Sequence, residues 1–390
     1  MTSFAVYSAV GVTLDSSTKI NAGLVGSNGD VSIGPFSRFA GLKAGGRLGF
    51  SSTGGGVTVI GPITFNGDVA LGQDFSVLGA INSGGSIGIN DRPHITGDIT
   101  AAGSVLIALS GGIVGNIRAG GNFRVGDFNT ITGDVLANGS ALVGGTVNGS
   151  VTCHDLSFQF PGQVNGKTRQ GAGAVTPAKY VPEALPPADT FKTGKENSSG
   201  ATTPDSPLPP GRYAALDAPD FRQVYLTAGD YSFQSITLGD SASLHLMNIS
   251  ATKGLHVFVS GDVHLGRFVK TFVKEQALVN ANTALAKKAL WEVLGKFDTL
   301  GSDEFFGTIF APNGPIVLGG NCTLTGSLVS GGPITAGVFF TETFEPSGKF
   351  VNWPPPAPLS SPPVLPPATG MKTAPAAPRP GGAGATSPQH

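Results

Sequence analysis

Apolar residues return every 18 positions in the stretch from Ile81 to Val135. The recurring residues fall into three series: Val77, Ile95, Ile113 and Ile131; Ile81, Ile99, Ile117 and Val135; and Ile87, Val105 and Phe123. A fixed period of this size is typical of repeat proteins, in which each repeat buries its apolar face against the next one. The chain is therefore expected to form a solenoid.

The spacing inside one repeat predicts the kind of solenoid. Apolar residues step by six, eight and four positions, from Ile81 to Ile87, Ile95 and Ile99. The left-handed hexapeptide solenoid of acyltransferases needs equal steps of six. Ile87 and Ile89 lie two apart, which is the period of a strand, and glycine fits the corners between strands. The sequence therefore predicts an all-β, three-sided, right-handed parallel β-helix with about 18 residues per coil.

The pattern divides the chain into four parts. We expect a first solenoid of about eight coils over residues 1–166 and a second one over residues 212–350. Residues 167–211 are rich in proline and lack periodicity, so they are expected to cross the rod as an irregular excursion or to act as a flexible linker. Residues 351–390 are rich in Pro and Ala and are expected to be disordered.

One segment of the second solenoid departs from the strand pattern. Residues 272–297 contain no Gly or Pro except Gly295, and Ala, Leu, Lys and Glu dominate there. A stripe at helical spacing is formed by Leu278, Leu285, Ala289, Val293 and Phe297. The pattern predicts one inserted amphipathic α-helix, which packs on its own solenoid or, as the alternative, binds a partner.

Composition excludes several kinds of partner. Only 13% of the 390 residues are charged, 59 are Gly, and the formal net charge is -1. A nearly neutral chain does not attract nucleic acid or an anionic membrane, and little charge repulsion separates two copies. No apolar run approaches the ~20 residues of a membrane span, and the N-terminal residues do not read as a signal peptide.

The residues that could carry chemistry form no convincing site. His245, His256 and His264 fall on successive strands and could share one face, but exposed strand histidines are the simpler interpretation. Cys153 and Cys322 are expected to be buried free thiols; a disulfide would require the two halves of the chain to stack. We therefore predict no catalytic residue, no cofactor and no metal site.

Acidic residues also favour a structural role. Asp91, Asp98 and Asp134 lie at expected corners, where an aspartate side chain supports the turn. Glycoside hydrolysis would instead need carboxylates stacked on one face. The sequence therefore predicts a protein that is not an enzyme.

Ice binding would need a regular row of threonines on a flat face. The outward position of Thr96 recurs in neighbouring coils as Leu78, Val114, Thr132 and Asn148. The outward position of Thr100 recurs as Asn82, Arg118, Leu136 and Thr152. Neither row is a threonine ladder, so a carbohydrate-active or ice-binding β-helix remains only the alternative function.

Two stretches resemble known families. Ile131-Thr-Gly-Asp-Val135-Leu-Ala resembles the coil of bactofilins, which are bacterial polymer-forming scaffold proteins. Gly307-Thr-Ile-Phe-Ala-Pro-Asn-Gly314 is similar to the closing coils of bacterial surface proteins of the choice-of-anchor type. Phe4-Ala-Val-Tyr7, with the stretch over residues 25–31, is similar to their opening coils.

Together these features predict a non-enzymatic structural scaffold. We expect self-association into a filament or lattice, or display of faces that bind other surface proteins or glycans. The second resemblance implies a cell-surface or extracellular location, with the cytoplasm as the alternative.

Overall fold

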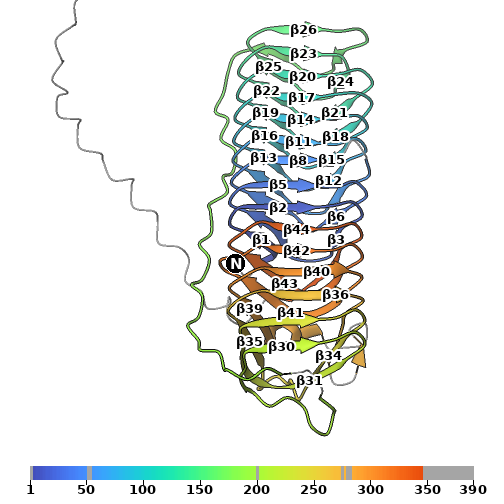
Figure 1. The fold of residues 1–390 in the computed structure, drawn as a ribbon. Coiled ribbons are helices and arrows are strands. Elements are labelled where there is room, and N and C mark those ends of the chain that lie inside the picture. The colour runs from blue at the N-terminus through green and yellow to red at the C-terminus, as the bar shows by residue number, and fades with distance from the viewer. Residues whose placement is uncertain (1–2, 51–54, 199–201, 274–275, 278–282, 346–390) are drawn as a thin grey trace, which may run out of the picture. The chain divides into compact units, whose positions relative to one another are not determined.

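The described part of the chain folds into a single column of stacked β-coils (Figure 1). The computed structural model describes residues 3–345 except 51–54, 199–201, 274–275 and 278–282. These residues form an all-β parallel solenoid of about 17 turns with about 19 residues per turn. The predicted fold class is thus confirmed. The Pro-rich tail over residues 351–390 lies outside the described residues.

Each coil of the first half contributes a short strand to each of three faces. The strands of the first face are β1 (Phe4–Ser8), β4 (Leu24–Ser27), β7 (Leu42–Ala44), β10 (Ile63–Phe65), β13 (Ile81–Ser83), β16 (Ile99–Ala101), β19 (Ile117–Ala119), β22 (Val135–Ala137), β25 (Val151–Cys153) and β28 (Thr168–Gln170). The second face has β2 (Gly11–Leu14), β5 (Asp30–Ile33), β8 (Leu48–Phe50), β11 (Val69–Leu71), β14 (Ile87–Ile89), β17 (Val105–Ile107), β20 (Phe123–Val125), β23 (Ala141–Val143) and β26 (Leu156–Phe158). The third face has β3 (Lys19–Ile20), β6 (Arg38–Phe39), β9 (Thr58–Val59), β12 (Ser76–Leu78), β15 (His94–Thr96), β18 (Gly112–Val114), β21 (Thr130–Thr132), β24 (Thr146–Val147) and β27 (Gln163–Val164).

The second half builds the same three faces with longer strands. Its first face has β29 (Gly211–Arg212), β32 (Gly229–Phe233), β35 (Leu255–Val259) and β39 (Ala289–Val293). Its second face has β30 (Ala215–Ala218), β33 (Ser235–Leu238), β36 (Val263–Arg267), β40 (Phe297–Gly301), β42 (Ile316–Leu318) and β44 (Ile334–Ala336). Its third face has β31 (Gln223–Thr227), β34 (Ser243–Met247), β37 (Lys270–Val273) and β45 (Thr341–Phe344). Two eight-residue strands, β41 (Glu304–Ala311) and β43 (Thr323–Ser330), pair with strands of both the third and the first face.

The two halves join in the reverse of their sequence order. The last coil of the second half pairs with the first coil of the chain: β43 with β1, β44 with β2 and β45 with β3. On the second face this produces one continuous sheet of 15 strands, from β30 at one end to β26 at the other. The amino-terminal coil therefore lies in the middle of the column, where both of its edges are paired.

The core follows the predicted inward positions. Ile81, Ile99 and Ile117 are aligned across neighbouring coils of the first face and are fully buried. Ile87 and Ile89 both point inward from β14, and the residue between them is partly exposed. Because every coil repeats this pattern, the apolar side chains form a continuous column whose burial drives the fold.

Glycine forms the corner between the third and first faces. Gly97, Gly115 and Gly133 have φ of +148°, +151° and +153°, in a region that other residues avoid. A Cβ on Gly115 would lie 2.2 Å from the carbonyl oxygen of Gly97. The tight stacking of coils at this corner therefore excludes any side chain.

Aspartates support the corners, as predicted. Asp98 Oδ1 accepts a hydrogen bond from the backbone N–H of Asn116 at 2.8 Å, and Asp134 Oδ1 accepts one from Ser150 at 2.8 Å. Asp91 Oδ1 accepts the N–H of Leu109 at 3.0 Å. Each carboxylate thus ties its own corner to the next coil.

The α-helix predicted over residues 272–297 is wrong. The segment is an enlarged coil that contains the end of β37, β38 (Gln276–Ala277), a 3-10 helix η2 (Thr283–Lys288), β39 and the start of β40. Of the predicted stripe, Leu278 lies outside the described residues. Ala289, Trp291 and Val293 pack in the central core, whereas Leu290 packs in a separate cluster, so the inward period is two. A spacing of four is also a multiple of the strand period, and the helical interpretation left out Trp291.

Residues 171–193 run along the outside of the column from one end to the other (green trace at the left of Figure 1). We call this segment the strap. Asparagines that directly follow first-face strands hold it: Gly173 N donates to Asn138 Oδ1 at 2.9 Å, and Tyr180 exchanges two hydrogen bonds with Asn66. In the coils between Asn28 and Asn138, the other equivalent positions are small residues, namely Gly45, Gly84, Ala102 and Gly120. These small residues leave room for the strap.

The strap also covers the junction of the two halves. Asn28 Oδ1 accepts hydrogen bonds from the Tyr7 hydroxyl at 2.7 Å, the Tyr180 hydroxyl at 3.0 Å and Glu183 N at 3.1 Å. A separate apolar cluster lies beneath the strap and comprises Phe4, Tyr7, Tyr180, Leu290, Phe310 and Val329. Burial raises the pKa of both tyrosines. The cluster joins the first coil, the last coils and the strap.

Cys153 and Cys322 are free and buried, which confirms the simpler prediction. The halves do stack, but end to end: Cys322 lies beside Asp303 near the junction, whereas Cys153 belongs to β25 near the far end of the column. This separation prevents a disulfide.

Candidate functional site

The three histidines considered as a metal site lie on three different faces. His245 is on β34 of the third face, His256 on β35 of the first face and His264 on β36 of the second face. Successive strands of a three-sided solenoid occupy successive faces, so their side chains diverge. The structure therefore contradicts the idea that these histidines line up.

His245 belongs to a stack of rings on the third face. Its ring stacks on Tyr225 at 4.2 Å and on Phe272 at 4.8 Å, and Ser243 Oγ lies 3.1 Å from its Nε2. The three rings come from adjacent coils, so their stacking stabilises the coils against one another.

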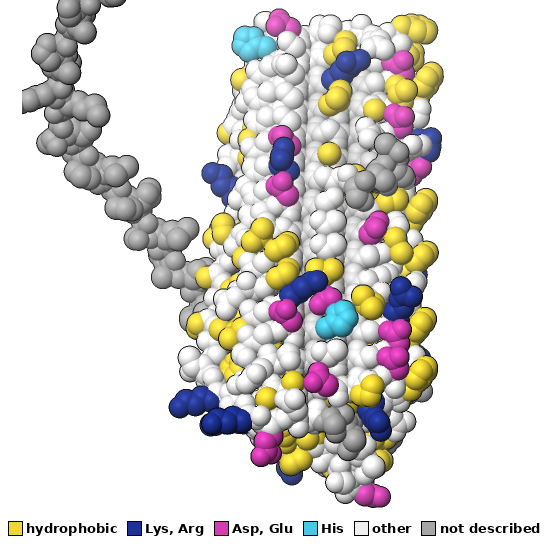
Figure 2. All heavy atoms as spheres, viewed as in Figure 1, with side chains coloured by type: hydrophobic (Ala, Val, Ile, Leu, Met, Phe, Trp, Pro, Cys, Tyr) yellow, Lys and Arg dark blue, Asp and Glu magenta, His cyan; other side chains and the backbone are white. Residues whose placement is uncertain are grey.

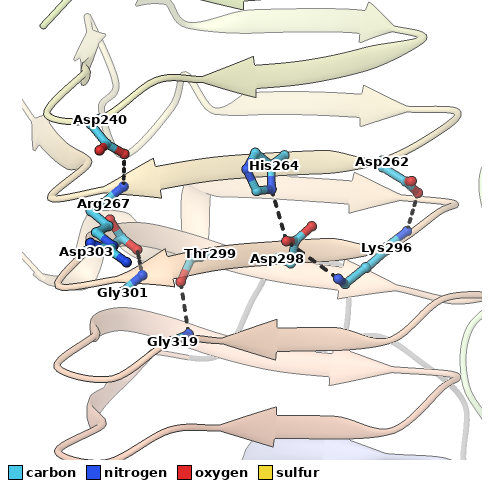
Figure 3. Close-up of polar contacts among 10 residues, drawn as sticks. All are labelled: Asp240, Asp262, His264, Arg267, Lys296, Asp298, Thr299, Gly301, Asp303 and Gly319. Carbon is cyan, nitrogen blue, oxygen red and sulfur yellow. Dashed lines mark hydrogen bonds and ion pairs between the residues drawn. The ribbon is translucent and has the colours of Figure 1, made fainter. Parts of the chain in front are cut away.

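His264 belongs to a polar network on the second face (Figure 3). Its Nδ1 lies 3.0 Å from Asp298 Oδ2, which also lies 3.5 Å from the Lys296 ammonium group. Lys296 N in turn donates to Asp262 Oδ1 at 2.7 Å. Figure 3 shows Asp240 supporting the opposite corner through the N–H of Arg267, at 2.8 Å. The network thus ties neighbouring coils together.

His256 lies in a cluster that the sequence did not reveal. The side chains of Asp189, His256 and Glu292 offer one ligand atom each within 4.8 Å of one another. Glu292 is fully buried, its Oε2 lies 3.6 Å from His256 Nε2, and its Oε1 accepts the N–H of Asp189. A cavity of about 530 Å³ adjoins the cluster.

The cluster acts as an anchor for the strap. One imidazole and two carboxylates are ligands that Zn²⁺ uses, but Lys287 and Lys288 line the same cavity, and their positive charge opposes a bound cation. Beyond it, the strap continues with Phe191 against Phe258 at 4.8 Å between ring centres. Asp189 comes from the strap and Glu292 from β39, so sequence spacing gave no sign that they meet.

The two outward rows weighed for ice binding have the predicted register. Leu78, Thr96, Val114 and Thr132 align in neighbouring coils. Asn82, Thr100, Arg118, Leu136 and Thr152 align in the same way. The mixture of apolar, charged and polar side chains along both rows is therefore a property of the folded surface.

The two ends of the column differ. At the end formed by residues 196–198, residues 202–208 and β29 to β31, backbone hydrogen bonds cover part of the outer edge: Ser198 N donates to Ala215 O and Leu208 N to Tyr225 O. At the other end, β26, β27 and β28 are the outermost strands. Phe158 and Phe160 are 53% and 93% exposed there. We call this second end the open end.

The family comparison concerns this open end. Residues 88–178 match the family model "Bactofilin: Polymer-forming cytoskeletal". The matched segment runs from β14 through β28 into the strap. It confirms the bactofilin-like character of the coils in this part of the chain. No curated protein matches the chain.

Two solved structures match the chain at low similarity. One is an ice binding protein from an Antarctic bacterium, Flavobacteriaceae, at 12% identity over 87% of this chain and 96% of that chain, with a TM-score of 0.29. The other is the Tapirin C-terminal domain of Caldicellulosiruptor kristjanssonii, at 14% identity over 86% and 92%, with a TM-score of 0.36. Within the described part of the chain, no helix is long and apolar enough to cross a membrane.

Proposed function

We propose that this chain is a non-enzymatic structural scaffold that self-associates through the open end of its solenoid. The observation that carries the proposal is the exposed last coil, formed by β26, β27 and β28, inside the segment that matches a polymer-forming family. The strand edges of that coil are the surface on which another copy can add.

The backbone of the open end is suited to pairing. Gln159 N donates inward to Val143 O at 2.9 Å. Because N–H groups alternate in direction along a strand, the N–H of Phe158 points away from the column. An exposed row of such groups is a template for another strand. Phe158 and Phe160 add apolar surface, so a second copy that covers this end gains both hydrogen bonds and burial.

The opposite end is less suited to pairing, because the chain itself satisfies part of its edge. Tyr231 Oη donates to Leu208 O at 2.7 Å and so holds the covering segment in place. An end contact restricted to the open end joins two copies. A longer polymer then needs a second surface.

Substitutions that introduce charge at the open end test the proposed self-association. The double variant Phe158→Lys and Phe160→Lys places positive charges on both partners of the contact, and lysine on an edge strand blocks pairing. Sedimentation velocity of the full chain is expected to show association for the wild type and loss of the end contact for the variant. Leu106→Lys, at an exposed outward position of β17 that belongs to neither the open end nor a corner, is the control. A wild type that sediments as a monomer at every concentration contradicts the proposal.

We place this assembly inside the cell, because the matched family is described as cytoskeletal. The similarity of residues 307–314 to surface proteins favours the cell surface as the alternative location. Fractionation of the source cell with an antibody to the chain tests the choice: a cytosolic or cytoskeletal fraction supports the first location, and labelling of intact cells supports the second.

A further inference from the structure

One corner of the solenoid places a residue in the left-handed conformation in nearly every coil. The corner lies between the second and third faces, and φ is close to +60° there. In order along the column, from β31 toward β27, the residues are Phe221, Ser241, Phe268, Ser302, Asn321, Phe339, Ser17, Phe36, Gly56, Asp74, Arg92, Ser110 and Phe128. We call this series the corner ladder and each position a rung.

Phenylalanine occupies five of these rungs against ordinary conformational preference. Asn, Asp and Ser suit such turns because their short polar side chains bond locally, whereas a bulky side chain at positive φ is an outlier that costs roughly 1–2 kcal/mol. Phe36, Phe128, Phe221, Phe268 and Phe339 are between 54% and 77% exposed, so burial does not offset that cost. Hydrophobic side chains recur along this edge, at the right of Figure 2.

The spacing of four of these phenylalanines is symmetric. Backbone hydrogen bonds link each rung to the next, for example Phe221 N to Asp240 O and Ser241 N to Arg267 O. Counted in rungs, Phe268 lies two beyond Phe221, Phe339 three further and Phe36 two further again. The series of steps, two, three and two, reads the same in both directions. Phe128 lies five rungs beyond Phe36 and outside the symmetric set.

We propose that this phenylalanine ridge binds a second copy of the chain, side by side and antiparallel. A two-fold axis between Ser302 and Asn321 places Phe221 of one copy opposite Phe36 of the other. The same axis places Phe268 opposite Phe339, so all four rings of each copy are matched. A two-fold contact uses the same patch on both partners and needs this kind of self-complementarity. The inference rests on the proposed function, because it supplies the second surface that a polymer needs.

The net charge of the chain and the exposed area of the ridge are compatible with such a pair. The formal net charge is -1, so two copies repel weakly. The charged corner residues Arg92 and Asp74 pair with each other at 2.6 Å and lie outside the symmetric set. The exposed rings offer roughly 500 Å² per copy, below the ~800 Å² of a standard interface partner. The lateral contact is therefore expected to be weak, and the open ends at both ends of such an antiparallel pair can link it to further pairs.

Disulfide trapping tests the antiparallel register without changing the ridge. Ser17 and Ser241 are rungs that the two-fold axis brings opposite each other. A mixture of the full-length S17C and S241C chains is expected to form a mixed disulfide, and neither variant alone is expected to cross-link to itself. The native cysteines are buried and do not compete. A mixture of S17C and S302C, which the axis leaves two rungs apart, is the control. Self-linked S17C, or equal yields in both mixtures, overturns the proposal.

A variant without the ridge phenylalanines distinguishes the lateral contact from the end contact. Phe221, Phe268, Phe339 and Phe36 are changed together to Ser, the residue of neighbouring rungs, and light scattering follows association. The wild type is expected to form species larger than an end-joined pair, the fourfold variant only end-joined pairs, and Phe128→Ser the wild-type species. Large species in the fourfold variant, or their loss in Phe128→Ser, contradict the ridge. A third outcome separates the two contacts. If the F158K/F160K variant loses all association and the S17C and S241C mixture forms no cross-link, the ridge contact is contradicted, whereas the end contact is supported.

Discussion

The two halves of the column form the same three-sided coils, but the number of residues per coil is regular only in the middle of the first half. In the middle of the first half, aligned residues such as Val105 and Phe123 lie 18 positions apart. In the second half, Val263 and Phe297 are aligned although 34 positions separate them. The register of the core is thus kept while the length of the loops varies. The inward columns specify the fold, and the corners and loops are free to carry other features.

The two halves also have different roles: the first half sets the length of the rod, and the second half carries most of the residues that make specific contacts. Short coils of the first half are nearly interchangeable, so they set the length of the rod. The enlarged coil of the second half is filled by aromatic side chains: Trp291 packs against Phe305 at 5.0 Å and Phe297 packs against Phe305 at 5.3 Å between ring centres. The same half supplies Glu292, which anchors the strap, and three of the four symmetric ridge phenylalanines.

The largest expected effect comes from the glycine corner of the regular half. Gly115→Ala is expected to lower the free energy of unfolding by about 4 kcal/mol, because of its φ of +151° and the overlap with Gly97 O. Gly88→Ala is the matched control: it is an outward strand position with open space around it, and its effect is expected to stay within about 0.5 kcal/mol. Urea unfolding measures both. Equal effects would contradict the steric account of the corner.

A smaller effect is expected where the strap crosses the junction. Asn28→Ala removes the acceptor for Tyr7, Tyr180 and Glu183 N and is expected to cost about 2–3 kcal/mol. Hydrogen exchange should show faster exchange in the strap around Glu183. Asn138→Ala, which removes one hydrogen bond to Gly173, is expected to cost about 1 kcal/mol. Identical exchange in both variants would show that the strap does not depend on Asn28.

Glu342 is a destabilising residue at the junction, and replacing it with an apolar residue should stabilise the fold. It is fully buried in β45, between Leu324 and Ile20, and its carboxyl oxygens have no hydrogen-bond partner among the described residues. Burial raises its pKa well above the ordinary value of 4.5. Glu342→Met is therefore expected to stabilise the protein by about 2 kcal/mol at neutral pH.

The gain from this substitution should depend on pH in one direction. Below the unfolded-state pKa both states of the wild type hold the proton, and the Glu342 carboxyl costs least. As the pH rises above about 4.5, the unfolded chain loses that proton while the folded chain keeps it, so wild-type stability falls relative to Glu342→Met. Thermal unfolding between pH 4 and pH 8 measures the difference. A difference that shrinks with rising pH would contradict a neutral buried Glu342.

The smallest effect is expected at the corner ladder. Phe128→Asn should stabilise the protein by about 0.5–1 kcal/mol, since asparagine suits positive φ and the exposed ring buries little. Ser110→Asn, at the preceding rung, is expected to be neutral. Destabilisation by Phe128→Asn in thermal unfolding would mean that the ring supports its own coil.

These contrasts show what the sequence could and could not predict. The steps of six, eight and four between apolar residues predicted the three faces, because inward side chains alone determine the coil. The spacing of four between Ala289 and Val293 led to the wrong prediction of an α-helix, because this spacing fits a helix and a strand equally. The meeting of Asp189 with Glu292 was not predictable, since it depends on how the strap returns along the column. The asparagines at positions 28, 66 and 138 share one coil position, and that recurrence was a readable sign of the strap.

The reverse order of the halves was also hidden from the sequence. Any coil end can stack on any other, because backbone hydrogen bonds between coils do not depend on side-chain identity. Only the ends differ: residues 196–198 and 202–208 partly cover one end, and the other remains open. The central claim concerns that open end.

Electron microscopy of the negatively stained full-length protein tests this claim most directly. Fifteen strands of the second face, spaced ~4.8 Å apart, give a single rod of roughly 70 Å. We expect rods of about twice this length, joined at one end, and their loss in the F158K/F160K variant. Single rods only, at every concentration of the wild type, would contradict a self-associating scaffold.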